Sequence, residues 1–246
     1  MPPHRIYIEP FLGGGAIMKM KRPACSSIGI DADADVVAQC HRWTTPPNLT
    51  VVHADALEWL PNTDFSNDTL IYLDPPYMFS TRRSQRQIYR YELTDAQHQQ
   101  LLASISNLGC MVMISGYWSE MYADALCGWR TSTFKTRTRG GNTATEWLWM
   151  NFPEPLELHD YQYLGKNFRE RERIKRKTQR WKNRLLAMKP LDRMAIMAAI
   201  SEIRPSPSEP AAPIAISNVL ARVNTPELMM QARIAIFEDA TRSYHH

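Results

Sequence analysis

The tetrapeptide Asp74-Pro75-Pro76-Tyr77 combines residue types that can hold and present a planar amine. An amine attached to an aromatic ring is a weak nucleophile, because its lone pair is delocalised into the ring. The Asp74 carboxylate and the Pro75 carbonyl can each accept one amine hydrogen and turn the lone pair outward. Pro76 stiffens the turn and removes a competing N–H donor. The ring of Tyr77 can stack on an extruded base, which contributes about 1–3 kcal/mol.

The position of this tetrapeptide favours a site over a plain surface turn. Asp, Pro and Tyr are all common in turns, so a rigid turn is the simpler interpretation of the four residues alone. The apolar run before them, however, predicts a strand over residues 69–74 that ends at Asp74. Ligands of open α/β sheets bind at the carboxyl ends of strands, so the turn is expected at an active site.

Residues 9–16, Glu-Pro-Phe-Leu-Gly-Gly-Gly-Ala, form a glycine-rich turn between a predicted strand and a predicted helix. Glycine lets a ligand approach the backbone closely. The segment lacks the Lys-Ser/Thr of a phosphate-binding P-loop, and its spacing fits a G-x-G-x-x-G dinucleotide fingerprint poorly. Taken alone, a plain tight turn explains it equally well.

Two acidic residues follow the next two predicted strands. Asp31 ends the strand over residues 27–31 and can bridge the two hydroxyls of a ribose. Asp55 follows the strand over residues 49–53 and can accept a hydrogen bond from an adenine amine. Each acid on its own is more often an ordinary helix cap.

Metal sites and disulfides are not expected. The Asp31-Ala32-Asp33-Ala34-Asp35 run resembles a calcium loop only superficially, since Val36 stands at the glycine position and Arg42 at the closing glutamate. No other cluster of His, Cys and Glu predicts a metal. The cysteines form no C-x-x-C pair and are expected to be reduced core thiols: Cys25, Cys40, Cys110 and Cys127.

The first 152 residues alternate short apolar runs with helical patterns, which is typical of a mostly parallel α/β sheet. The predicted strands cover residues 5–9, 27–31, 49–53, 69–74, 111–114, 130–136 and 145–152, the last two as a hairpin. The predicted helices in this region cover residues 16–20, 33–43 and 94–109. Beyond it, helices are predicted over residues 164–188, over 191–203 and from 225 onward.

The order of glycine loop, acid, acid and Asp-Pro-Pro-Tyr at successive strand ends resembles the Dam-type family of S-adenosylmethionine-dependent DNA N6-adenine methyltransferases, particularly its phage-encoded members. The resemblance spans roughly residues 6–152. The matching segments are residues 9–16, 28–31, 53–56 and 72–77, with weaker matches at 113–117 and 145–148. It implies an α/β fold with the Rossmann-like seven-stranded sheet of class I methyltransferases.

The resemblance also implies roles for individual residues. The cofactor S-adenosylmethionine would be lined by Glu9, Pro10, Phe11, Gly13 and Gly15, with its ribose on Asp31, its adenine beside Asp55 and Ala56, and Asp74 also in contact. The target adenine would be held by Asp74, Pro75, Pro76 and Tyr77. Asp at the first position favours adenine, whereas Asn resembles glutamine-modifying enzymes and Ser resembles cytosine N4 enzymes. The implied reaction is direct in-line attack of N6 on the methyl group, without a metal or a covalent enzyme intermediate.

Two departures from the family pattern affect what is expected. Family members usually have a further cofactor-contacting segment before the glycine loop, where this sequence has only residues 1–5 before the first strand. They also usually insert a target-recognition region before Asp-Pro-Pro-Tyr, where this sequence has 18 residues between Asp55 and Asp74. The hypothesis that follows is weak sequence reading, or reading by parts of the chain placed elsewhere.

Three segments are candidates for contact with double-stranded DNA carrying a flipped-out adenine. The loop after the catalytic turn offers Arg82, Arg83, Arg86 and Tyr89; the hairpin offers Lys135, Arg137 and Arg139; the basic helix offers Lys166, Arg169, Arg173 and Lys177. The simpler interpretations are a polar loop and a solvated helix. In the latter an apolar stripe packs on the domain, formed by Phe168, Ile174, Trp181 and Leu185.

The charge distribution agrees with a polyanionic partner. The net charge is +4, but residues 165–193 contain 12 Lys and Arg against 3 Asp and Glu. Residues 1–164 contain 13 against 17. A basic block of this kind favours nucleic acid, although basic helices without such a partner are common. RNA adenine is therefore the nearest rival substrate, and a non-catalytic nucleic-acid-binding protein on the same fold is the rival from another class.

The domain prediction has four parts. Residues 1–155 form the methyltransferase domain and 156–204 a basic helical extension; 205–213 form a linker containing four prolines, and 214–246 a C-terminal helical segment. A homodimer through the C-terminal helices is a further hypothesis. With 44% hydrophobic residues, no run long enough for a membrane span and no apolar signal core, the expectation is a folded, cytoplasmic protein.

Overall fold

A computed structural model of the chain describes residues 1–40, 42–43, 48–82, 90–137 and 143–203. The chain divides into two compact units, residues 1–174 and 175–246. The predicted linker 205–213 and the segment 214–246 lie outside the described residues. In the part of the chain that is described, no helix is both long and apolar enough to cross a bilayer.

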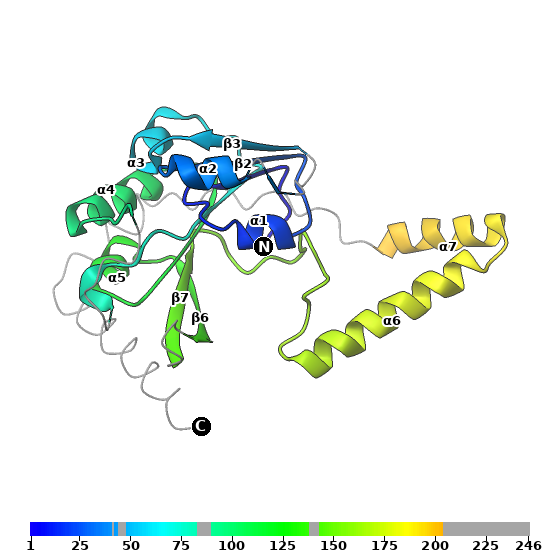
Figure 1. Cartoon of the computed structure of the whole chain (residues 1–246). Helices are drawn as coiled ribbons and strands as arrows, with labels where there is room; N and C mark the ends of the chain where they lie inside the picture. The colour runs from blue at the N-terminus through cyan, green and yellow to red at the C-terminus, as the bar shows by residue number, and fades with distance from the viewer. Residues whose placement is uncertain (41, 44–47, 83–89, 138–142, 204–246) are drawn as a thin grey trace, which may run out of the picture. The chain divides into compact units, whose positions relative to one another are not determined.

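The first unit is built on a seven-stranded sheet with the order β3-β2-β1-β4-β5-β7-β6 (Figure 1). Its strands are β1 (Ile6–Glu9), β2 (Ser26–Asp31), β3 (Leu49–His53), β4 (Thr69–Leu73), β5 (Met111–Gly116), β6 (Arg130–Arg137) and β7 (Thr143–Met150). Strands β1 to β5 pair in parallel, and β7 is antiparallel to both β5 and β6. This order, with an antiparallel β7 beside β5, is that of the class I methyltransferase fold, so the predicted fold class is confirmed.

Helices cover both faces of the sheet (Figure 1). On one face lie α1 (Ala16–Met20) and α2 (Ala34–Cys40), and on the other lie α3 (Ala56–Trp59), α4 (Asp95–Ser106) and α5 (Glu120–Ala125). Successive strand residues point to opposite faces, so Leu70 packs with Met18 of α1, whereas Ile71 packs with Leu101 of α4. Two short 3-10 helices follow α3 and β4, at Leu60–Asn62 and Phe79–Thr81.

Several element boundaries differ from the sequence prediction. Helix α2 ends at Cys40, because the N–H groups of Arg42 and Trp43 bond three residues back and tighten the chain out of the helix. Helices α3 and α5 were not predicted, since four and six residues are too few to show a helical period. Helix α4 begins where expected, with a capping box between Thr94 and Gln97.

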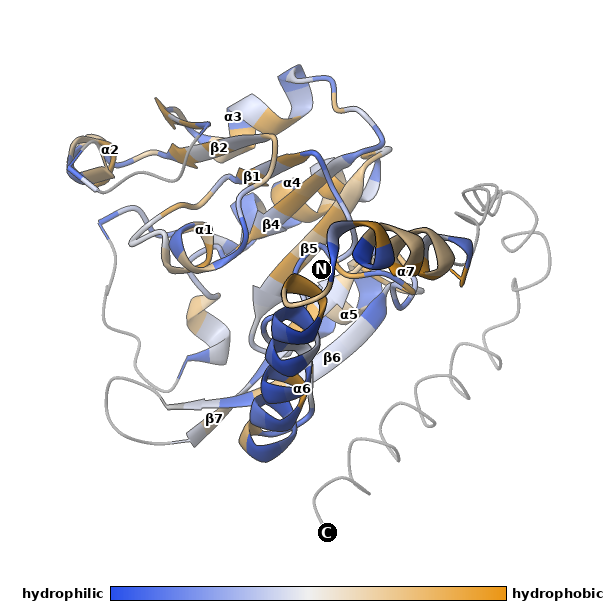
Figure 2. Cartoon of the chain, turned by 90° about the vertical axis from the view of Figure 1, so that its right-hand side faces the viewer, coloured by the Kyte–Doolittle hydropathy of each residue, from blue (hydrophilic) through white to orange (hydrophobic). Residues whose placement is uncertain are grey.

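Helix α6 (Phe168–Leu186) is strongly hydrophilic and α7 (Pro190–Ile203) mostly hydrophobic (Figure 2). No side chain of α6 is buried, and Phe168 and Trp181 are 70% and 51% exposed. Ile174 and Leu185 are half-buried, and the packing of this apolar stripe on the domain remains a prediction.

The cysteines are divided between the core and the surface. Cys40 and Cys110 are buried, as expected of core thiols, and all four cysteines are unpaired. Cys25 and Cys127 are exposed, which corrects the expectation for those two. Cys25 lies in a bend just before β2, and Cys127 lies in the turn after α5.

Candidate active site

The carboxyl ends of the parallel strands meet at one edge of the sheet and carry the acidic residues singled out in the sequence. Glu9 ends β1, Asp31 ends β2, and Asp74 follows β4. Asp55 comes two residues after β3. Because β3, β2, β1 and β4 are neighbours in that order, the four acids share this edge of the sheet.

The glycine loop is fixed to the end of β2. The Leu12 N–H donates to the Ile30 carbonyl at 2.9 Å, and the Gly13 N–H donates to Asp31 Oδ2 at 2.8 Å. Gly13 has a positive φ of 48°, and a Cβ added there or at Gly14 would meet no atom within 4 Å. This part of the loop is therefore open to a ligand approaching the backbone.

Gly15 is the packed end of this loop, and its contact with a cofactor remains a prediction. It is buried, with φ at 59°, and a Cβ at this position would clash with the Trp43 ring. Glycine is thus required here for packing and for the left-handed backbone that starts α1. Lys19 Nζ lies over the Trp43 ring, 3.5 Å from its centroid, so Gly15, Lys19 and Trp43 form a small packed group.

Asp31 presents a carboxylate held in place by two backbone donors. Oδ2 accepts from the Gly13 N–H, and Oδ1 accepts from the Asp33 N–H at 2.9 Å. Each carboxylate oxygen can accept a further hydrogen bond. The side chain therefore has the chemistry and rigidity needed to bind the hydroxyls of a ribose.

Asp55 is a helix cap, the simpler of the two roles considered from the sequence. Its Oδ1 accepts from the Leu57 N–H at 2.8 Å and begins α3. The residue is exposed, whereas the neighbouring Ala56 is buried. Contact with an adenine amine remains a prediction for Asp55.

Glu9 is buried rather than presented to solvent. Its side chain is 4% exposed and accepts a hydrogen bond of 2.7 Å from the Tyr7 hydroxyl. Burial raises the pKa of Glu9 to about 7, against the opposing effects of the Tyr7 hydrogen bond and the charge of Lys21. Pro10 is also buried, and Phe11 packs half-buried against the core. Contact of these three residues with a cofactor remains a prediction.

Asp74 is exposed to solvent, and polar side chains lie next to its carboxylate. The Ser115 hydroxyl from β5 lies 2.9 Å from Asp74 Oδ1, 3.1 Å from the Leu73 carbonyl and 3.1 Å from the Tyr72 hydroxyl. Partial desolvation raises the pKa of Asp74, and hydrogen bonds from Ser115 and Tyr77 oppose this rise. The carboxylate is thus oriented before any substrate binds.

Tyr77 is held from two sides. Its hydroxyl donates to Glu146 Oε2 at 3.1 Å, and its ring meets that of Tyr117 edge-on, with the centroids 4.7 Å apart. Burial and the neighbouring carboxylates Asp74 and Glu146 raise the pKa of Tyr77, so it remains a neutral phenol. Pro75 is buried and Pro76 half-buried, which makes the turn between Asp74 and Tyr77 rigid.

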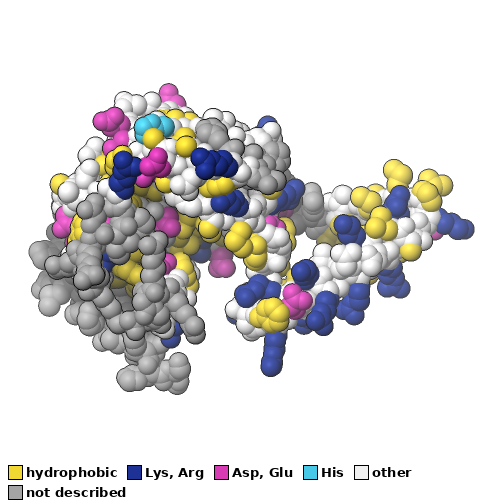
Figure 3. Space-filling model, viewed as in Figure 1, with side chains coloured by type: hydrophobic (Ala, Val, Ile, Leu, Met, Phe, Trp, Pro, Cys, Tyr) yellow, Lys and Arg dark blue, Asp and Glu magenta, His cyan; other side chains and the backbone are white. Residues whose placement is uncertain are grey.

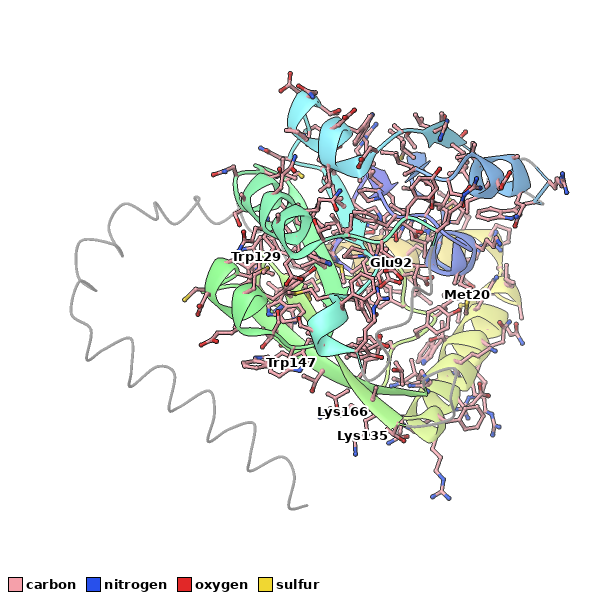
Figure 4. The ribbon with its side chains drawn as sticks, turned by 60° about the vertical axis from the view of Figure 1, so that its left-hand side comes forward. Met20, Glu92, Trp129, Lys135, Trp147 and Lys166 are labelled. Atoms are coloured by element: carbon pink, nitrogen blue, oxygen red, sulfur yellow. The ribbon has the colours of Figure 1, made fainter. Side chains whose placement is uncertain are left out.

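The expected DNA contact of Arg82 is corrected. Its two guanidinium N–H groups donate to the two carboxylate oxygens of Glu92 (Figure 4), at 2.9 and 2.6 Å. The Arg82 side chain is 6% exposed. A side chain buried in this way is not available to a phosphate. The sequence gives no hint of this pair, because its partner lies ten residues further on. The other candidates in this loop, Arg83, Arg86 and Tyr89, lie outside the described residues.

The remaining cationic candidates are at exposed positions wherever their side chains are described. Lys135 lies on β6, near the free end of the β6–β7 hairpin (Figure 4). Arg137 ends that strand, and Arg139 lies outside the described residues. Lys and Arg side chains gather along α6 (Figure 3). The exposed candidates on or just before this helix are Lys166, Arg169, Arg173 and Lys177.

Sequence reasoning assigned no role to three residues whose side chains contact one another, Asp74 or Tyr77, nor to the buried His98. Ser115 and Glu146 are polar residues within apolar strands, and Tyr72 precedes Asp74 by two, so it shares its face of the sheet. These signals are visible in the sequence. His98 is fully buried in α4 with Nδ1 2.9 Å from the Tyr122 hydroxyl, and burial lowers the pKa of His98 to about 4. Nothing in the sequence separates it from an ordinary helix residue.

Among the described residues, no group of three or more His, Cys, Asp and Glu side chains is arranged to hold a metal ion. Comparison of the sequence with protein-family models and with curated proteins gave no match.

Several solved structures with a similar fold are methyltransferases. One is an rRNA methylase from Streptococcus thermophilus, at 10% identity and a TM-score of 0.40 over 61% of this chain and 88% of that one. Another is the 23S rRNA methyltransferase ErmE, at 13% identity and 0.40 over 71% and 78%. A third is an S-adenosylmethionine-dependent methyltransferase from Anabaena variabilis, at 12% identity and 0.40 over 61% and 76%. These similarities concern the fold alone.

Proposed function

We propose that this protein is an S-adenosylmethionine-dependent methyltransferase that modifies the N6 amine of adenine in DNA. The observation that carries the proposal is the arrangement at the end of β4. There, Ser115 fixes the Asp74 carboxylate, a rigid Pro75-Pro76 turn follows, and Tyr77 presents an anchored aromatic ring. These are the groups that an exocyclic amine on a planar base requires.

The residues present fit the proposed cofactor. The open backbone at Gly13 and Gly14 would admit its methionine portion, and the doubly anchored Asp31 carboxylate would accept hydrogen bonds from its ribose hydroxyls. Bound there, S-adenosylmethionine supplies a methyl group on a sulfonium, which needs no metal for its transfer.

The protein's own residues would orient the amine. Asp74 and the Pro75 carbonyl each accept one amine hydrogen, which turns the nitrogen lone pair out of conjugation with the ring. Tyr77 stacks on the base and prevents it from tilting. Orientation and a fixed polar environment supply most of the rate in such a reaction. The exposed cations of α6 support a nucleic acid as the carrier of the base.

The test is methyl transfer from labelled S-adenosylmethionine to unmethylated DNA and, separately, to RNA, followed by mass spectrometry of the nucleosides. Asp74→Ala is assayed beside the wild type. We expect N6-methyladenine from DNA, and none from the variant. Product from RNA alone would overturn the DNA substrate. Cofactor binding without any product would favour a non-catalytic binding protein.

A further inference from the structure

Glu146 is an acidic residue in the apolar strand β7, and both of its carboxylate oxygens are engaged. Oε2 accepts from the Tyr77 hydroxyl at 3.1 Å, and Oε1 accepts from the Thr136 hydroxyl of β6 at 2.8 Å. The side chain is half-buried. A carboxylate at such a position loses part of its hydration, so its two hydroxyl donors are needed to compensate it.

The sheet register explains why Glu146 reaches the site. Leu148 pairs with Ser115, and Glu146 lies two residues before Leu148, so Glu146 and Ser115 share one face of the sheet. Tyr72 pairs with Met113, two residues before Ser115, and belongs to the same face. Hydroxyl and carboxylate groups therefore follow one another across β4, β5, β7 and β6 on the side where Asp74 emerges.

We propose that Glu146 is a positioning residue for Tyr77, fixing the plane of the ring on which the substrate base stacks and taking the phenol hydrogen. This inference rests on the proposed function. The phenol has one hydrogen, and both Asp74 and Glu146 are near enough to influence it. When Glu146 takes it, the lone pairs of Asp74 remain available to the amine. The Tyr117 ring also contacts the Tyr77 ring, with the centroids 4.7 Å apart, and so helps to restrain it.

Three substitutions separate the contributions. Glu146→Ala releases the hydroxyl and is expected to lower kcat/KM for DNA by about 10- to 100-fold, the range for a hydrogen bond to a charged group. Tyr77→Phe removes the same bond from the other side, so the double variant should be little worse than either single variant. Glu146→Gln retains an acceptor and should recover most of the activity. Glu157→Ala, at an exposed position, is the matched control.

The pH profile gives a readout that a merely structural role would leave unchanged. The titratable groups around Asp74 are Glu9 from β1, Tyr72 from β4, Tyr77, Tyr122 from α5 and Glu146 from β7. The negative charge of Glu146 raises the pKa of Asp74, and a hydrogen bond from Tyr77 lowers it. Removing Glu146 takes away the charge that raises the pKa of Asp74, and it leaves the Tyr77 hydroxyl to donate to Asp74 alone. Both changes favour the ionised form of Asp74. The acid limb of kcat/KM is thus expected at lower pH in Glu146→Ala and Glu146→Gln.

The contact itself is tested independently of activity, by NMR of the full-length protein labelled at tyrosine ¹³Cζ. The Tyr77 resonance is assigned from its disappearance in Tyr77→Phe, and it should shift in Glu146→Ala but not in Glu157→Ala. An unshifted resonance would overturn the inference, as would multiplicative effects of Glu146→Ala and Tyr77→Phe on kcat/KM. A wild-type protein that makes no N6-methyladenine would instead overturn the proposed function, and the NMR result would still decide the contact.

Discussion

The Ser115 hydroxyl donates a hydrogen bond of 2.9 Å to Asp74 Oδ1, joining two neighbouring parallel strands at the point where the candidate site begins. The same oxygen lies 3.1 Å from the Tyr72 hydroxyl, which can donate to it in turn. Asp74 therefore keeps one orientation without help from a ligand. For an enzyme that works by orienting its substrate, this rigidity contributes directly to the rate.

Removing this bond should slow the reaction. Ser115→Ala is expected to lower kcat by about 10- to 100-fold, because hydrogen bonds to charged groups contribute about 1.5–3 kcal/mol. The affinity for S-adenosylmethionine should be unchanged, since Ser115 does not belong to the glycine loop. Steady-state kinetics with DNA and cofactor titration measure the two effects. Ser106→Ala, at an exposed position of α4, is the control. Wild-type kcat in Ser115→Ala would contradict this role.

The buried Glu9 should make stability depend on pH. Burial raises the pKa of Glu9 from 4.5 to about 7. Between these values the unfolded chain has released the proton and the folded chain retains it, so the free energy of unfolding falls as pH rises through this range and levels off above it. The full difference corresponds to about 3 kcal/mol.

Glu9→Gln removes this titration and can keep the Tyr7 hydroxyl as a partner. Its stability relative to the wild type should therefore grow between about pH 5 and pH 8, by up to about 3 kcal/mol. Urea unfolding at several pH values measures the difference. A difference that stays constant over this range would show that Glu9 titrates normally in the folded protein.

The parallel strands of the sheet, and the position of Asp74 at a strand end, could be predicted from the sequence. Central parallel strands such as β4 and β5 are buried on both faces, and their nearly continuous apolar runs identify them. The strand-end position of Asp74 follows directly from that prediction. The short helices α3 and α5 were missed, because their caps, Asp55 and Ser119, are residue types that occur in many loops.

The contacts between distant segments were beyond sequence reasoning. A row of arginines after the catalytic turn indicates phosphate binding, yet Arg82 is buried against Glu92. A glycine-rich loop after a strand indicates room for a ligand, yet Gly15 makes room for Trp43. In both cases the partner is fixed by tertiary packing, which local residue patterns do not encode.

The Arg82–Glu92 pair should be structural. Breaking a buried ion pair leaves one charge unpaired, so Glu92→Ala is expected to lower the free energy of unfolding by about 3–5 kcal/mol. Replacing both partners, as in Arg82→Met with Glu92→Leu, should cost much less. Urea unfolding measures both. If Arg82→Gln instead left stability unchanged and weakened DNA binding, Arg82 would be a phosphate contact after all.

The cations on and just before α6 should increase the affinity for DNA by binding its phosphates. Changing Lys166, Arg169, Arg173 and Lys177 to Gln should weaken binding and reduce the slope of log K against log salt, by about 0.9 for each phosphate that these cations neutralise. Fluorescence anisotropy with a duplex at several salt concentrations measures this. Arg42→Gln, an exposed cation outside this helix, is the control. An unchanged slope would mean that α6 does not bind the DNA backbone.

The most direct test of the account compares wild type with Asp74→Asn in a single turnover on duplex DNA, with labelled S-adenosylmethionine. The substitution preserves the shape of the side chain and replaces one hydrogen-bond acceptor by a donor. We expect N6-methyladenine from the wild type, a rate at least about 100-fold lower in the variant, and cofactor binding unchanged. Equal rates in the two proteins would contradict it, because Asp74 would then not hold the amine.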